Sequence, residues 1–178
     1  MDFAAQVSRI ALFLFALYYG ITDGKTVELL VSNPMKGSDK NYVDFTTLRL
    51  TKDRDTRQLK VSGSFTIGKD MTEEELAYTL YVKSPRSKQF STTPMYYKAG
   101  PICEFIKDDK EFYADAVKVS NLPAPGTCPF PKGTYTINNY LMNEDNIPNV
   151  PAGEYRVTIT LKSLGKLISG YEAIAKIS

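Results

Sequence analysis

The chain has 178 residues and carries 22 basic and 20 acidic side chains, a formal net charge of +2 at neutral pH. This balance is too mild for a nucleic-acid-binding protein, whose basic residues cluster on one face. Histidine is absent, which excludes Ser–His and Cys–His nucleophilic catalysis and nearly every zinc or copper site. An enzyme would have to work with carboxylates, Lys or Tyr alone, so we predict a protein that is not an enzyme and needs neither a cofactor nor a metal. A hydrolase that acts on a lipid or a sugar is the alternative.

Residues 1–24 have the pattern of a secretory signal peptide. Arg9 precedes an uninterrupted apolar run, residues 10–19, and small and turn-forming residues follow it. The run is far shorter than the ~20 residues that cross a bilayer as a helix. Small residues at positions −3 and −1 predict cleavage near residues 22–24, after Thr22 or Gly24. An uncleaved membrane anchor and an N-terminal core helix are the alternatives. We expect a secreted, extracellular protein without stable membrane insertion, in which residues 25–178 form a single domain.

Two segments of the remaining chain alternate between apolar and polar residues, as half-buried strands do. Gly63 occupies an inward position of the first segment, which marks a bulge, a bend or space kept open. Weaker strand patterns cover 26–32, 42–51, 76–84, 134–142 and 167–177. The apolar sets of the two clear segments are Leu59, Val61, Phe65 and Ile67 in 58–67, and Tyr155, Val157, Ile159 and Leu161 in 154–163.

Residues 102–119 break the strand pattern, because their apolar side chains recur at helical spacing and charged ones fall between them. Pro101 fits a helix entrance, and the proline-rich segment 121–129 ends the helix. The chain as a whole predicts a mainly β fold. We expect an antiparallel β-sandwich or open β-cup of about seven to eight strands, with one α-helix that covers an edge or a mouth.

Cys103 and Cys128 are the two cysteines of the chain. In an oxidising compartment they form the one available pair, so we predict a single disulfide; two free, buried thiols are the alternative. The bridge would tie the start of the predicted helix to the start of the strand that follows Cys128.

Three acidic clusters, at 72–75, 107–111 and 143–146, raise the question of paired catalytic acids or a calcium site. No cluster has the spacing of a calcium loop. The first fits a helix cap, the second the solvated face of the predicted helix, and the third a loop tip. We therefore interpret all three as structural.

Aromatic residues are abundant, with 12 Tyr and 9 Phe, and several fall on inward faces. Such a pattern is typical of a packed core, but it is also typical of a cavity for an apolar ligand, because both share one hydrophobic periodicity. Tyr135 and Tyr155 could contact a ligand through their hydroxyls, since buried hydroxyls need partners. The candidate cavity-lining residues are Phe45, Phe65, Leu80, Phe105, Phe112, Tyr135, Tyr155 and Ile159.

Three stretches, 102–113, 120–140 and 148–161, together resemble an insect family of secreted proteins that includes the chemosensory B proteins. That family is similar to the ganglioside activator protein and to the wider lipid-recognition β-sandwich group. The shared signature combines Cys-Pro-x-x-Lys-Gly-x-Tyr, beginning at Cys128, with Pro-x-Gly-x-Tyr-Arg, beginning at Pro151.

The resemblance implies a lipid-recognition-like β domain with an interior for a lipid or another apolar molecule, and no catalytic residues. It also implies that Cys103 and Cys128 form the bridge. Gly133 with Tyr135, and Gly153 with Tyr155, would be framework residues. We expect a non-enzymatic carrier of a small hydrophobic ligand, with a role in chemosensation and an unidentified receptor or enzyme partner. The alternative is an extracellular interaction module with a filled core and no ligand.

Overall fold

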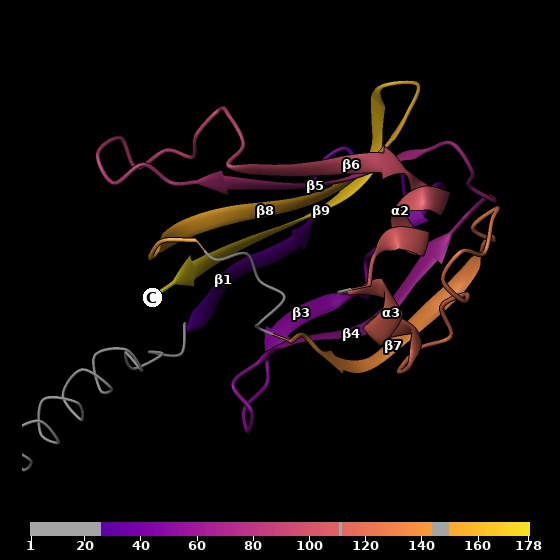
Figure 1. The fold of residues 1–178 in the computed structure, drawn as a ribbon, viewed down its shortest axis with the longest axis horizontal. Helices are drawn as coiled ribbons and strands as arrows, with labels where there is room; N and C mark the ends of the chain where they lie inside the picture. The colour runs from indigo at the N-terminus through magenta and orange to yellow at the C-terminus, as the bar shows by residue number, and fades with distance from the viewer. Residues whose placement is uncertain (1–25, 111, 144–149) are drawn as a thin grey trace, which may run out of the picture.

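The computed structural model describes residues 26–110, 112–143 and 150–178. The predicted signal peptide and most of the 143–146 cluster lie outside these residues. Two antiparallel sheets make up the described part (Figure 1). The larger sheet has the order β1 (Val27–Pro34), β9 (Lys166–Ile177), β8 (Gly153–Ser163), β5 (Glu75–Val82) and β6 (Tyr96–Pro101). In the smaller sheet β4 (Leu59–Ile67) pairs with β7 (Gly133–Leu141) on one side, and with β2 (Val43–Asp44) and β3 (Arg49–Lys52) on the other.

The predicted β-sandwich is confirmed, and the described part contains nine strands. The number is higher than expected for two reasons. Segment 42–51 is interrupted at Phe45–Leu48 and splits into β2 and β3. Strand β6 has no sequence signal, because it is an edge strand whose residues are mostly exposed and do not alternate.

The single predicted helix is two short helices, α2 (Ile102–Asp108) and α3 (Tyr113–Val117). The chain turns at Asp109, whose backbone is extended. The Asp109 carboxylate accepts a hydrogen bond from the backbone N–H of Phe112 at 2.9 Å, and such side-chain bonds compete with helix continuation. Helix α2 contacts β5 and β6, and α3 contacts β7, so the helices cover one open side of the sandwich (Figure 1).

The predicted disulfide is confirmed. Cys103 of α2 is bonded to Cys128, in the segment that precedes β7, with 5.6 Å between the two Cα atoms. The bridge joins the helical side of the sandwich to the smaller sheet. No helix in the described ranges is long and apolar enough to cross a membrane.

Gly63 marks a bulge, and the space beside it is filled. The β4–β7 register shifts between Val61 and Gly63. Gly63 has φ +102°, and a Cβ atom there would lie 2.2 Å from the carbonyl oxygen of Thr47. Glycine is required at this position because a neighbouring backbone approaches closely, and ligand space plays no part in it.

The core between the sheets is divided into separate apolar clusters. The first lies under α2 and around the disulfide, the second lies toward the opposite ends of the strands, and the third joins α3 to β7. Their buried members are Val43, Ile67, Met71, Ile102, Ile106, Phe130, Tyr135 and Leu161; then Val27, Leu59, Leu80, Val150, Tyr155, Ala175 and Ile177; then Ala116, Ile137 and Tyr140.

Candidate ligand-binding site

A pocket of about 540 Å³ lies where β1, at the edge of the larger sheet, faces the β2–β3 side of the smaller one. Its volume falls within the roughly 300–1,000 Å³ of small-molecule sites. We call it the edge pocket. It is lined by Ser32, Asn33, Pro34, Met35, Gly37, Ser38, Lys40, Val43, Asp44, Phe45, Thr46 and Arg49.

Phe45 connects the edge pocket to the interior. Its half-buried ring lies 5.8 Å from the ring of Phe65 and 6.0 Å from that of Tyr171, measured between centroids. Phe65 in turn lies 5.5 Å from Tyr135, and Tyr135 lies 5.3 Å from Phe130. An aromatic chain therefore leads from the pocket to the first core cluster.

Charged side chains surround the outer part of the edge pocket. Lys40 and Arg49 are exposed, and Asp44 is half-buried. Hydrogen bonds from the hydroxyl and backbone N–H of Thr46 lower the pKa of Asp44, so this carboxyl is ionised at neutral pH. The pocket combines an apolar base with a charged rim.

Two cross-strand rows run inward from the edge pocket along the inner face of the larger sheet. They are formed by β1, β9, β8 and β5 in that order, and Ser32 and Pro34 of the pocket are their outer ends. The Ser32 hydroxyl oxygen lies 2.7 Å from that of Tyr171. The rows are Ser32–Ala173–Val157–Leu80 and Pro34–Tyr171–Ile159–Tyr78.

The Val157 side chain is more exposed than its position in these rows would predict. It belongs to β8, which is paired on both sides, and it shares its face with Tyr155 and Leu161. Those two residues are 2% and 5% exposed, whereas Val157 is 36% exposed. Because the strand has no free edge there, this surface faces the space between the sheets.

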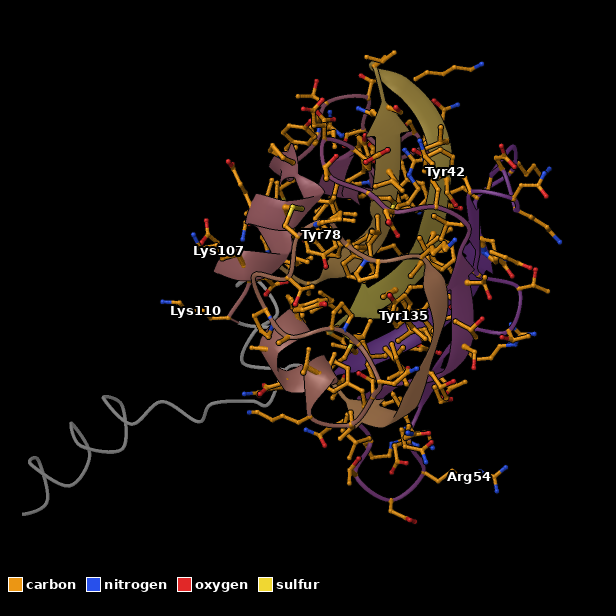
Figure 2. The ribbon with its side chains drawn as sticks, turned by 90° about the vertical axis from the view of Figure 1, so that its right-hand side faces the viewer. Tyr42, Arg54, Tyr78, Lys107, Lys110 and Tyr135 are labelled. Atoms are coloured by element: carbon orange, nitrogen blue, oxygen red, sulfur yellow. A yellow bond between two sulfur atoms is a disulfide. The ribbon has the colours of Figure 1, made fainter. Side chains whose placement is uncertain are left out.

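The rows end near a polar group at the helical side of the sandwich. The Tyr78 ring packs edge-on against Phe105 of α2, 5.0 Å between centroids, and Figure 2 shows Tyr78 among the side chains between the helices and the strands. Burial, and next the charge of Asp109, raise the pKa of Tyr78. Tyr78 nevertheless keeps some accessible surface, which is consistent with a position beside enclosed space.

The interpretation of cluster 107–111 as a solvated face is wrong for Asp109. Lys107 and Lys110 point away from the protein in Figure 2 and are exposed, but Asp109 is only 5% exposed. The turn after α2 directs this carboxylate inward. Helical periodicity predicts the side of the helix on which a side chain lies only while the helix continues, and α2 ends at Asp108.

Tyr140 of β7 completes the polar group. It is 7% exposed and packs in the third core cluster. Its hydroxyl is buried and has no hydrogen-bond partner among the described residues. Burial, followed by the charges of Asp115 and Asp109, raises the pKa of Tyr140 to about 12.

The eight predicted cavity residues fall into different parts of the interior. Phe45, Phe65 and Tyr135 lie on the aromatic chain, and Leu80 and Ile159 lie on the cross-strand rows. Tyr155 packs with Leu80 in the second core cluster. Phe105 contacts Tyr78. Phe112 is half-buried at the start of α3. Ligand contact by any of them stays a prediction. Sequence reasoning missed Ser32, Tyr78, Tyr140, Tyr171 and Ala173.

Tyr135 and Tyr155 belong to the framework through their hydroxyls. Each hydroxyl donates to the carbonyl of a proline four residues earlier, Pro131 and Pro151 respectively, at 2.6 Å. The two rings lie against Gly133 and Gly153. This arrangement is that of a tyrosine corner, in which a hydroxyl fixes the entry of a strand. Both hydroxyls have backbone partners, and contact of either with a ligand stays a prediction.

Removing the corner hydroxyl of Tyr155 is expected to destabilise the fold. In Tyr155→Phe the Pro151 carbonyl loses the donor of a partly buried hydrogen bond, which costs about 0.5–1.5 kcal/mol. Urea denaturation measures the loss. Tyr97→Phe is the control: its ring is 54% exposed, so its stability should change by less than about 0.5 kcal/mol. Equal stability of the two variants would contradict the role of the corner.

A smaller hollow of about 280 Å³ lies on the outer face of the larger sheet. Threonines of β5 and β8 contribute to it together with Tyr81, Arg156 and Glu172. The Arg156 guanidinium stacks 4.6 Å from the Tyr81 ring centroid. The strand residues that line this hollow point away from the inward rows, and Met35 lines both the hollow and the edge pocket.

Within the described ranges no three His, Cys, Asp or Glu side chains are grouped to hold a metal ion. The arrangement of apolar rows, aromatic base and one polar end suits the holding of a small molecule.

One family model matches part of the chain. Residues 76–157 match the model of a family described as "Protein of unknown function (DUF1091)". A search of curated proteins found no match to this chain. The matched segment runs from β5 to the middle of β8 and includes the disulfide, both helices and β7. The chain is therefore similar to this family in the part that carries the helical side of the sandwich.

Proposed function

We propose that the protein is a non-enzymatic carrier that binds a lipid or another small hydrophobic molecule between its two sheets. The ligand would enter at the edge pocket and lie along the cross-strand rows. The observation that carries this proposal is the accessible surface of Val157 on the inner face of a doubly paired strand. A filled core would have covered this side chain.

The energetics of such a site are those of apolar burial. Removing apolar surface from water contributes ~25 cal/mol per Å², before the cost of ordering the ligand is subtracted. Selectivity then depends on the shape of the space and on a few polar groups at its ends. The edge pocket and the Tyr78–Tyr140 end are the two places where polar groups adjoin the rows.

Secretion and a chemosensory role are part of the proposal. The disulfide supports an oxidising compartment. The resemblance to the chemosensory B proteins and the ganglioside activator rests on residues 102–161, most of which lie inside the segment that matches DUF1091. That resemblance supports a carrier or accessory role outside the cell, with a receptor or an enzyme as a further partner.

A titration with a neutral apolar dye, 1-N-phenylnaphthylamine, tests the binding function. The protein is secreted from eukaryotic cells and stripped of bound lipid with organic solvent, and its fold is checked by circular dichroism. We expect saturable binding of one dye per chain, reversed by long-chain alkanes. A folded, stripped sample that binds no dye would indicate an interaction module with a filled core.

A further inference from the structure

The hydroxyl of Tyr140 is a buried hydrogen-bond donor that is unsatisfied among the described residues. The residue is 7% exposed, and the described residues offer its hydroxyl no partner. Buried polar groups are normally satisfied, and an exception calls for an unseen partner. Tyr135, on the same strand, shows the contrast, because its hydroxyl is bonded to Pro131.

Elements from both sheets and from the helices meet around this donor. Tyr140 lies opposite Val61 in the smaller sheet and packs with Ala116 of α3. Across the interior, Tyr78 of the larger sheet packs on Phe105. Asp109 follows one turn after Phe105, since its backbone N–H bonds to the Phe105 carbonyl at 3.0 Å. Asp109 is close enough to both Tyr78 and Tyr140 for its charge to act on their hydroxyls, and the two tyrosines come from opposite sheets.

Open apolar surface adjoins this polar end. Tyr78 pairs directly with Ile159, and the neighbouring row places Val157 beside Leu80. Val157 and Ile159 both keep accessible surface on the inner face. A molecule whose apolar body covers these two residues would bring one end to the tyrosine hydroxyls.

The charges near this end are unfavourable for an anion. The Asp109 charge raises the pKa of both Tyr78 and Tyr140, and the Asp115 charge raises that of Tyr140 as well. Both hydroxyls stay protonated at neutral pH and act as donors. Lys98 of the edge strand β6 lies 5.0 Å from the Phe105 ring centroid, and Lys118 pairs with Asp115 at 2.5 Å. Both lysine side chains are exposed to solvent.

We propose that the bound ligand has an apolar chain and a neutral hydrogen-bond-accepting end, such as an ester, aldehyde, ketone or alcohol, and that the Tyr140 hydroxyl donates to this end beside Tyr78. Free carboxylates are disfavoured because Asp109 is buried nearby. This inference rests on the proposed carrier function and adds the chemical class of the ligand.

The test compares three ligands of one chain length as competitors of 1-N-phenylnaphthylamine at pH 7.5: hexadecane, methyl palmitate and palmitate. Wild-type protein is expected to bind the ester at least tenfold more tightly than the alkane or the carboxylate. In Tyr140→Phe the advantage of the ester over the alkane should fall to below threefold, with alkane affinity unchanged. Tyr97→Phe is the control, because its ring is exposed on the edge strand β6, and it should keep the full advantage.

Each other outcome overturns the inference in a recognisable way. If ester and alkane bind wild-type protein equally, the carrier function stands but the polar end makes no contribution. If palmitate binds most tightly, a cation such as Lys98 selects the ligand instead. If Tyr140→Phe keeps the ester advantage, only water partners the Tyr140 hydroxyl. Binding of none of the three, and of no dye, overturns the carrier function itself. Should Tyr140→Phe fail to fold, the inference is tested by the wild-type affinities for the three ligands and by the same comparison in Tyr78→Phe.

Discussion

Replacing Val157 by phenylalanine is expected to abolish ligand uptake while the fold keeps its stability. The larger ring would occupy the space that the Val157 side chain faces, between Leu80 and Ala173 in its row. An apolar ligand could then no longer lie along the inner face, and dye affinity should fall by more than about 100-fold. Because the added atoms enter open space, the free energy of unfolding should not decrease.

Leu161→Phe is the matched control for this experiment. Leu161 lies on the same strand and the same face but is 5% exposed and packed in the first core cluster. Enlarging a packed side chain typically costs about 1–3 kcal/mol. Urea denaturation of both variants separates the two situations. If Val157→Phe is destabilised as much as Leu161→Phe, the interior around Val157 is filled and the proposed binding space does not exist.

Removing the disulfide is expected to cost the fold roughly 3 kcal/mol. Cys103 and Cys128 are 25 residues apart, and opening a loop of this size releases about that much conformational free energy to the unfolded chain. The segment between the two cysteines contains both helices. Without the bridge, the helical side of the sandwich is no longer covalently joined to the smaller sheet. For a chain of this length the corresponding decrease in Tm is roughly 6–12 °C.

The Cys103→Ala, Cys128→Ala double variant tests this by thermal unfolding followed by circular dichroism. Wild-type protein with a reductant should unfold at nearly the same temperature as the variant, and the reductant should not change the variant. A reductant that leaves the wild-type Tm unchanged, although both thiols become titratable, would contradict the stabilising role.

The strands that sequence reasoning found are those whose apolar and polar residues alternate. Segments 58–67 and 154–163 alternate because each lies inside a sheet, with its apolar residues toward the other sheet and its polar residues on the outer face. Strand β6 was missed, since an exposed edge strand needs no alternation. The helix was predicted too long, because the side-chain bond that turns the chain at Asp109 leaves no periodic signal.

The candidate site was harder to predict, because it depends on contacts between distant segments. Alternation put Val157 and Ile159 on an inward face, but no local pattern reveals that Val157 keeps its surface. The row that joins Ser32 to Val157 is set by strand pairing across the whole chain. The partners of the Tyr135 and Tyr155 hydroxyls could have been found, since each lies in a Pro-x-Gly-x-Tyr sequence.

Native mass spectrometry of the protein secreted from eukaryotic cells, before and after organic extraction, tests the carrier function most directly. We expect a discrete extra mass that is lost on extraction, returns after incubation with a lipid mixture, and belongs to a neutral apolar compound. The Val157→Phe variant should carry no extra mass. A wild-type protein that is unliganded as secreted, and stays so after incubation with lipids, would contradict the binding of a ligand between the sheets.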